Sequence, residues 1–220
     1  MNTTSENLGL SPFEYVGSTE VSGKIQMELL KKEGLIKSSS VLEIGCGCLN
    51  LGILLIEYLD KNNYVGIDPN EWLRTDSILT NQKIISDKSP VFISREDFDS
   101  SELKRGFDFI FSHSVLSHTA DWQLDLFLEN SKKALNKGGK ILSSIRLAEG
   151  NSFGSEGSID GKDSNDEQWQ YPGVSWFTMN TLNDKAAKFG LSVINIPEYT
   201  EFYVDKRPGE CHDWLLFTLK

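Results

Sequence analysis

Apolar residues follow two alternating patterns along the chain. Short apolar runs, typical of buried strands, alternate with longer segments in which apolar residues recur every three or four positions, as in helices. In residues 21–36, Ile25, Leu29 and Leu30 share one helical face, and Gly34 ends the segment. The alternation predicts an α/β fold with a Rossmann-like, mostly parallel sheet and helices on both faces.

The same patterns give the individual elements. Besides residues 21–36, the expected helices are 51–60, 121–136 with Asp121 as a cap, and 178–190 closed by Gly190. Seven strands are expected, the fifth after a glycine stop: 40–45, 64–68, 90–94, 107–115, 138–147, 191–199 and 212–220. The last two strands, joined by a non-helical turn, are predicted to form an antiparallel terminal hairpin.

The length of 220 residues suits a single domain. Four parts are expected within it: an N-terminal lid and helix (1–36), a cofactor-binding core (37–147), a loop or acceptor lid (148–177), and a closing helix and hairpin (178–220). Residues 149–170 are polar, glycine-rich and acidic. A loop of this length is usually either a functional lid or disordered, and both interpretations stay open.

Composition and charge exclude several classes of partner. The net charge of −10 disfavours nucleic acid and anionic membrane surfaces. No apolar run approaches the roughly 20 residues of a membrane helix, and the N-terminus lacks the segments of a signal peptide, so a cytoplasmic location is expected. Three cysteines do not make a disulfide framework, and Cys46 and Cys48 are expected to pack under a loop. The spacing of histidines and acids predicts no metal site.

The stretch "VLEIGCGCLNLG" (41–52) carries the first chemical signal. A glycine turn between a first strand and the next helix is the nucleotide-binding corner of an open α/β sheet. Gly45 and Gly47 let the backbone approach a ligand that a Cβ would block. Asp68, at the end of the second strand and about 20 residues downstream, suits the hydroxyls of a ribose.

Two other nucleotide-binding classes fit this turn poorly. A nicotinamide or flavin enzyme would have a third glycine at position 50, where Asn50 stands, and Glu43 would repel a pyrophosphate. A P-loop is excluded because no G-K-[ST] follows. Glu43 instead suits a ligand with a positive centre, such as an amine or a sulfonium.

Five segments in order resemble the motifs of class I S-adenosylmethionine-dependent methyltransferases. "VLEIGCGCLNLG" resembles their first motif, E/D-x-G-x-G-x-G, with Leu49 in place of the third glycine. The other four segments are "YVGIDPN" (64–70), "EDF" (96–98), "FDFIFSHSVLSH" (107–118) and "LNKGGKILSSI" (135–145). The resemblance covers about residues 41–147.

The resemblance implies S-adenosyl-L-methionine as cofactor and S-adenosyl-L-homocysteine as product. Glu43, Gly45 and Gly47 would line the methionine end, and Asp68 would hold the ribose. Asp97 and Phe98 would meet the adenine, although Asp97 also fits a helix cap. The full set of implied cofactor-binding residues is Tyr15, Glu43, Gly45, Cys46, Gly47, Asp68, Pro69, Asn70, Asp97, Phe98, Ser112 and His113.

The acceptor would be handled by histidines and by aromatic residues near the predicted loop. His113 lies at the carboxyl end of the fourth strand, where open α/β sheets bind ligands, and it is a candidate base. His118 resembles a family position that packs against the cofactor and is the second catalytic candidate. The substrate-binding candidates are Arg146, Trp169, Tyr171, Trp176, Tyr203 and His212.

These observations predict a methyltransferase that acts on a small molecule, with a hydroxyl oxygen of a sugar or another biosynthetic intermediate as the favoured acceptor. Methylation of nitrogen or of a peptide is the alternative. A catalytically inactive scaffold that keeps the cofactor fold is the alternative from another class. The protein is expected to be a monomer or a homodimer.

Overall fold

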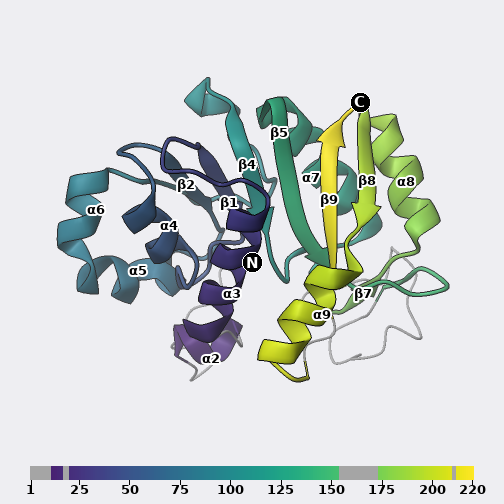
Figure 1. The fold of residues 1–220 in the computed structure, drawn as a ribbon, viewed down its shortest axis with the longest axis horizontal. Coiled ribbons are helices and arrows are strands. Elements are labelled where there is room, and N and C mark those ends of the chain that lie inside the picture. Colours follow the sequence, from purple (N-terminus) through teal and green to yellow (C-terminus); the bar gives the residue numbers. More distant parts are fainter. Residues whose placement is uncertain (1–10, 17–19, 154–172, 210–211) are drawn as a thin grey trace. The chain divides into compact units, whose positions relative to one another are not determined.

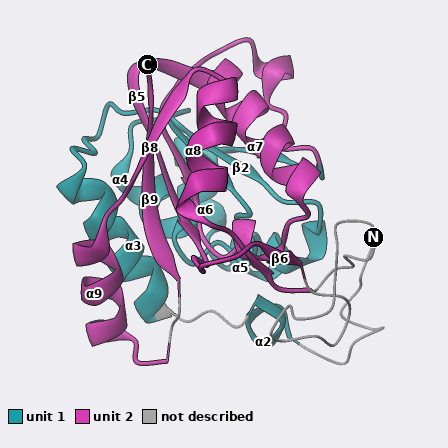
Figure 2. Cartoon of the chain, turned by 90° about the vertical axis from the view of Figure 1, so that its right-hand side faces the viewer, with its two compact units in different colours: residues 1–96 teal, residues 97–220 magenta. Residues whose placement is uncertain are grey.

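The computed structural model describes residues 11–16, 20–153, 173–209 and 212–220 (Figure 1). The chain divides into two compact units, residues 1–96 and 97–220 (Figure 2). Between them the units supply the seven strands of a mostly parallel sheet, so the predicted fold class is confirmed.

Unit 1 contains three parallel strands in the order β3-β2-β1. Every residue of β1 and β2 is buried, which explains why both strands read as continuous apolar runs. The strands are β1 (Val41–Ile44), β2 (Tyr64–Ile67) and β3 (Val91–Ile93). The helices are α2 (Pro12–Val16), α3 (Glu20–Lys32), α4 (Gly52–Tyr58), α5 (Glu71–Thr80) and α6 (Gln82–Lys88).

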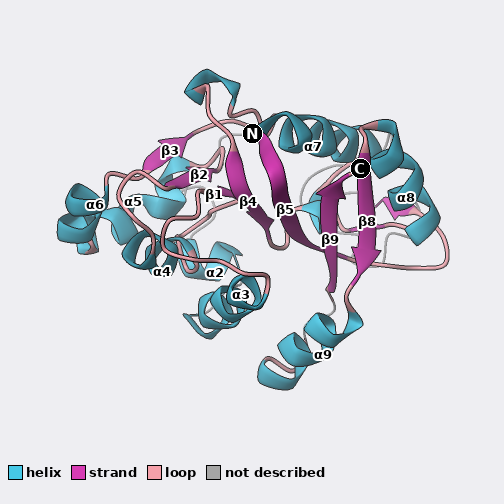
Figure 3. Ribbon diagram, turned by 45° about the horizontal axis from the view of Figure 1, so that its top comes forward, coloured by secondary structure: helices cyan, strands magenta, loops and turns pink. Residues whose placement is uncertain are grey.

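Unit 2 contributes four strands to the main sheet, in the order β4-β5-β9-β8, with β4 and β5 parallel and the other two pairs antiparallel. The strands are β4 (Phe107–Ser112), β5 (Leu135–Ile145), β8 (Leu191–Asn195) and β9 (Asp213–Leu219). The α-helices are α7 (Asp121–Ala134), α8 (Met179–Lys188) and α9 (Pro197–Lys206), and the 3-10 helices are η1 (Ser101–Leu103) and η2 (Leu116–His118). Figure 3 shows α7 and α8 on one side of these strands and α9 on the other.

A short antiparallel pair, β6 (Ser152–Phe153) and β7 (Ser175–Trp176), lies outside the main sheet. Its two strands flank the segment 154–172, which lies outside the described residues, so the choice between lid and disorder stays open. After β5 the chain is fixed to β7, because Phe177 donates its N–H to the Arg146 carbonyl (3.0 Å) and Ala148 donates to the Phe177 carbonyl (3.0 Å).

Three local predictions are wrong. Asp121 is the first residue of α7 and not its cap: Ala120 precedes the helix, and its N–H donates to the Gln123 side chain (2.9 Å). The predicted glycine stop is part of β5, which begins at Leu135 immediately after α7. Gly138 has φ +80° within that strand, so the glycine serves an irregular strand backbone.

The third wrong prediction concerns the end of the chain. The antiparallel pairing of the last two strands is confirmed, but their connection is the helix α9 and not a non-helical turn. Pro197 is the first residue of this helix, and β8 ends earlier than expected, at Asn195. Proline is favoured at a helix start because the N–H that it lacks has no intrahelical partner there.

Candidate functional site

The glycine turn after β1 is closed by hydrogen bonds to the end of β2. Gly45 and Gly47 have φ of +76° and +46°, in the left-handed region that favours glycine. The amides of Gly45 and Cys46 both donate to the Ile67 carbonyl, at 2.8 and 3.1 Å. The turn therefore has the backbone conformation for which the two glycines were predicted.

Asp68, the first residue after β2, is buried beside this turn. Its Oδ2 accepts the Gly47 N–H (3.0 Å) and its Oδ1 accepts the Asn70 N–H (2.9 Å). Burial raises the pKa of the Asp68 carboxyl, although the two N–H donors and the Arg74 charge oppose the shift. Each carboxylate oxygen keeps capacity for a further donor. Pro69 and Asn70 are half-buried next to it.

Arg74 is a member of this cluster that sequence reasoning missed. Its side chain is buried, and it donates to the Asp68 carbonyl (3.2 Å) and to the Ser94 hydroxyl (2.6 Å). It therefore joins the carboxyl ends of β2 and β3. An arginine in the first turns of a helix gives no sequence signal for such a role, because its partners are set by strand pairing.

Glu43 lies below the turn rather than on its surface. Its Oε2 accepts the Tyr64 hydroxyl at 2.5 Å, and only 5% of the residue is exposed. Burial raises the pKa of Glu43 to about 8; the Tyr64 hydrogen bond lowers it and the Asp68 charge raises it further. The carboxyl is therefore mostly protonated near neutral pH. Its predicted contact with the methionine end of the cofactor stays a prediction.

Two more glycines make room for this packing. A Cβ on Gly52 would lie 2.6 Å from the Tyr64 hydroxyl and 3.2 Å from Glu43 Oε2. A Cβ on Gly23, in α3, would lie 2.2 Å from the Asn50 carbonyl oxygen. A glycine inside a helical pattern, as at position 23, was the available signal for this close approach.

Cys46 and Cys48 are both buried free thiols, so the expectation that they pack under the loop is confirmed. Cys46 Sγ faces β2, where a Cβ on Gly66 would lie 2.9 Å from it. Burial raises the pKa of both thiols, that of Cys48 to about 11. The cofactor contact predicted for Cys46 stays a prediction.

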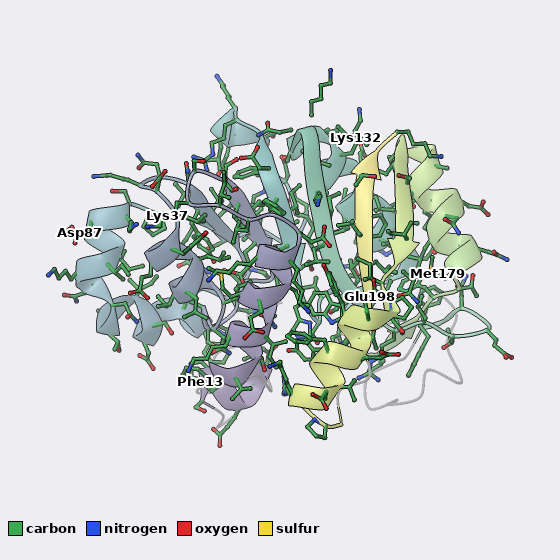
Figure 4. The ribbon with its side chains drawn as sticks, viewed as in Figure 1. Phe13, Lys37, Asp87, Lys132, Met179 and Glu198 are labelled. Carbon is green, nitrogen blue, oxygen red and sulfur yellow. The ribbon has the colours of Figure 1, made fainter. Side chains whose placement is uncertain are left out.

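Helix α2 lies beside the turn. Tyr15 packs edge-on against Trp72 of α5, with ring centroids 5.3 Å apart. Val16 Cγ1 lies 3.3 Å from the point where Gly47 would carry a Cβ. Phe13, on the same helix, is exposed (Figure 4). Trp72 is therefore an unpredicted partner of Tyr15, while the predicted N-terminal lid and the cofactor contact of Tyr15 stay predictions.

In unit 2, His113 directly follows β4 and is held on several sides. Its Nδ1 lies 2.8 Å from Ser144 Oγ and its Nε2 lies 3.2 Å from the Tyr203 hydroxyl. Its ring stacks on Trp214 with a centroid distance of 5.4 Å and an interplanar angle of 5°. The structure thus brings together two predicted residues, His113 and Tyr203, with two unpredicted ones, Ser144 and Trp214.

The other two histidines have different surroundings. His212 is buried, with its ring 5.2 Å from that of His113 and its Nε2 3.1 Å from Ser117 Oγ. His118 Nδ1 donates to the Gly173 carbonyl at 3.3 Å. His118 therefore holds the segment that leads into β7. The catalytic role predicted for His118 and the substrate contact predicted for His212 stay predictions.

The remaining predicted cofactor residues of unit 2 are mostly occupied by internal contacts. Phe98 is buried against Phe127 of α7, with ring centroids 5.8 Å apart. Asp97 Oδ1 accepts the Asp99 N–H (3.2 Å), and the Asp97 carbonyl accepts from Asn130 (2.7 Å). Ser112 is fully buried. Their cofactor contacts stay predictions.

Arg146 and Trp176 form a contact at the end of β5. The guanidinium carbon lies 5.1 Å from the centre of the Trp176 ring, within the range of a cation–π interaction. Arg146 Nε and Trp176 Nε1 are both buried and have no hydrogen-bond acceptor in the described structure. A buried donor without an acceptor costs about 1–3 kcal/mol. Trp169 and Tyr171, the other predicted aromatic contacts, lie outside the described residues.

Within the described ranges, no three His, Cys, Asp or Glu side chains are grouped so that they could hold a metal ion. In the same part of the chain, no helix combines the length and apolar character needed to cross a membrane.

Comparisons with known proteins agree with this arrangement. A family model described as a methyltransferase domain matches residues 42–141. An uncharacterized methyltransferase of Bacillus mycoides (strain KBAB4) is 33% identical over 103 residues, which are 47% of this chain and 45% of that protein. The match thus spans less than half the length of the curated relative.

Solved structures share the fold at low identity. Magnesium protoporphyrin IX methyltransferase from Synechocystis PCC 6803, solved with bound S-adenosylmethionine, superposes with a TM-score of 0.59 at 12% identity, covering 91% of this chain and 80% of that one. The glycopeptide N-methyltransferase MtfA superposes with a TM-score of 0.64 at 11% identity, covering 91% and 90%. The residues matched by the family model begin in β1 and reach β5, and the solved structures show that the chain shares the fold of S-adenosylmethionine-dependent methyltransferases.

Proposed function

We propose that this chain transfers the methyl group of S-adenosylmethionine to a hydroxyl oxygen of a small molecule, such as a sugar or another biosynthetic intermediate. The observation that carries the proposal is the setting of His113. The imidazole stands at the carboxyl end of β4, half-buried, between Ser144 and Tyr203. Open α/β sheets bind their ligands at this end of the strands.

The residues of unit 1 fit the cofactor. The left-handed backbone at Gly45 and Gly47 supports the proposed approach of a ligand to the turn, and Asp68 offers unused acceptor capacity beside it. In this proposal the Asp68 carboxylate accepts the two ribose hydroxyls. The bound cofactor supplies an electrophilic methyl group on a sulfonium.

The residues of unit 2 orient the acceptor and remove its proton. With the cofactor bound, its sulfonium would supply the methyl group to the acceptor oxygen by displacement, and the electron pair of the broken carbon–sulfur bond would stay on sulfur. The proton of the hydroxyl passes to His113. Ser144 and the stacked Trp214 fix the plane of the imidazole, and the acceptor hydroxyl takes the place of the Tyr203 hydroxyl at Nε2.

Nitrogen is the alternative acceptor atom, and MtfA, which shares the fold, is described as a glycopeptide N-methyltransferase. A base contributes most when the acceptor is weakly acidic, so a fixed histidine favours oxygen over a neutral amine. Hydrolysis of the labelled product and analysis of the methylated atom decide between them.

Cofactor binding tests the role of unit 1. Asp68→Asn is expected to weaken S-adenosylhomocysteine binding at least tenfold, about 1.4 kcal/mol, because a ribose hydroxyl loses a charged acceptor. Isothermal titration calorimetry measures the affinity, and Asp76→Asn, an exposed acid on α5, is the matched control. If wild-type protein binds neither S-adenosylmethionine nor S-adenosylhomocysteine, the inactive-scaffold interpretation replaces the proposal.

Transfer of a tritiated methyl group to fractionated cell metabolites tests the reaction. Once an acceptor fraction is found, His113→Gln is expected to lower turnover by about 10²- to 10⁴-fold while the affinity for S-adenosylhomocysteine stays unchanged. Unchanged turnover in this variant would show that His113 is structural.

A further inference from the structure

Arg146 directly follows β5, close to the strand residue that contacts His113. Ser144 lies two residues earlier, so the Cα atoms of Ser144 and Arg146 are about 7 Å apart. Ser144 Oγ is 2.8 Å from His113 Nδ1. The backbone at Arg146 stays fixed beyond the strand end, because its carbonyl accepts the Phe177 N–H.

Among the residues that the structure describes, the Arg146 guanidinium contacts the Trp176 ring and forms no ion pair. Its Nε and the adjacent Trp176 Nε1 are two buried donors that lack acceptors in the described part of the chain. Asp213 is the nearby acid, since it pairs in register with Ile145, but its Oδ2 accepts the Leu147 N–H at 3.0 Å. The described ion pairs do not include Arg146.

The chemistry of these donors fits a carboxylate. A guanidinium and an indole N–H offer planar, directional donors that match the two oxygens of a carboxyl group, and arginine binds such groups in a bidentate manner. The protein as a whole carries a net charge of −10, which repels anions. An anionic substrate therefore needs a local cation, and the half-buried Arg146 supplies one.

From the Arg146–Trp176 pair of donors without acceptors, just after the β5 residue that contacts His113, we propose that the methyl acceptor is a hydroxy acid, whose carboxylate is anchored by Arg146 and Trp176 while its hydroxyl is presented to His113. This inference rests on the proposed function. The Trp176 ring beside the guanidinium favours an aromatic or otherwise flat acid.

The test is calorimetric and does not require turnover. With the protein saturated with S-adenosylhomocysteine, 4-hydroxybenzoate is expected to bind at least tenfold more tightly than its uncharged counterpart, 4-hydroxybenzamide. Arg146→Gln is expected to remove this preference, and Arg146→Lys to restore only part of it because lysine lacks the planar fork. Lys206→Gln, an exposed position with the same charge change, is expected to keep it.

Several outcomes decide the matter. Equal binding of acid and amide by wild-type protein, or an unchanged preference in Arg146→Gln, overturns the inference. Tighter binding of 4-hydroxyphenyl phosphate than of 4-hydroxybenzoate overturns the carboxylate assignment. Should Arg146→Gln fail to fold, Trp176→Phe, which keeps a ring and removes the indole N–H, is expected to lower the preference several-fold, and an unchanged preference would overturn the inference. Binding of S-adenosylhomocysteine is measured first. A protein that does not bind S-adenosylhomocysteine would contradict the proposed function, and not the proposed binding of a carboxylate by Arg146 and Trp176.

Discussion

Leu49 adopts φ +63° at the position where the family motif has its third glycine. A left-handed backbone costs a residue with a Cβ roughly 1–2 kcal/mol. The Leu49 side chain is buried, and full burial of a leucine contributes about 1.5–3 kcal/mol. The apolar contact therefore outweighs the strain, so the turn keeps its glycine-like conformation without a glycine.

The buried Glu43 carboxyl predicts how the stability of the protein depends on pH. Its folded-state pKa of about 8 lies above the ordinary value of 4.5, so the native state holds a proton that the unfolded chain releases. This contribution to stability is fully present below about pH 4.5 and is lost as the pH rises toward about 8. Glu43→Gln imitates the protonated carboxyl, so relative to wild type it should gain stability over this range, by up to about 1.4 kcal/mol per pH unit.

Urea denaturation of both proteins between pH 5 and 8 measures this difference. Glu57→Gln, an exposed position on α4, serves as the control and should follow wild type at every pH. A Glu43→Gln variant that runs parallel to wild type would mean that Glu43 is ionised in the native protein.

At the scale of elements, a lysine joins α7 to α8. Lys185 Nζ lies 2.7 Å from Asp121 Oδ2 and 2.9 Å from Asp125 Oδ1, and its side chain is only 14% exposed. Burial alone would lower the pKa of Lys185, but the two carboxylates raise it overall. Burial raises the pKa of Asp125, but hydrogen bonds and ion pairs with Lys188 and Lys185 lower it by more, so the pKa of Asp125 lies below its ordinary value.

Lys185→Met should therefore destabilise the protein by about 1–3 kcal/mol, because two partly buried carboxylates lose their shared cation. Lys188→Met is the matched control: its 61% exposed side chain also pairs with Asp125, and an exposed ion pair contributes about 0–1 kcal/mol. Denaturation in urea at pH 7 gives both values. Since the pKa of Asp125 is lowered, the stability that its ion pair contributes should be lost only as the pH falls below 3.8, the ordinary pKa of an aspartate. Equal losses in the two variants would show that burial at Lys185 is unimportant.

Elements with regular apolar patterns were predictable, and those fixed by distant contacts were not. The fully buried β1 and β2 read directly from the sequence. Helix α9 was missed because its first residues were assigned to the preceding strand and the rest to a non-helical turn, although Pro197 marked a helix start. At the site, the glycine turn and Asp68 were foreseen from spacing. Arg74, Tyr64 and Ser144 were not, because strand register and burial choose these partners, and neither follows from neighbours in the sequence.

At the scale of the whole molecule, binding and folding are coupled. A ligand that binds only the native state adds about 2.7 kcal/mol of stability at 100 times its dissociation constant. For a chain of 220 residues this corresponds to a rise of about 5–10 °C in the unfolding midpoint.

S-adenosylhomocysteine should produce this rise in a thermal melt. Asp68→Asn should need at least ten times more ligand for the same shift, while Asp76→Asn should match wild type. A midpoint that does not move at millimolar ligand would contradict the assignment of the cofactor. Adenosine offers a further comparison, because it keeps the ribose and lacks the amino-acid end.

The two thiols packed beneath the glycine turn allow the local opening of this turn to be measured. Protonated and enclosed, Cys46 and Cys48 cannot meet an alkylating reagent until the turn opens. In a Cys211→Ser variant, the rate at which a maleimide reacts with Cys46 and Cys48 therefore measures how often the glycine turn opens. Slowing of that rate by a bound nucleoside would report that the nucleoside occupies this turn, without an assay of methyl transfer.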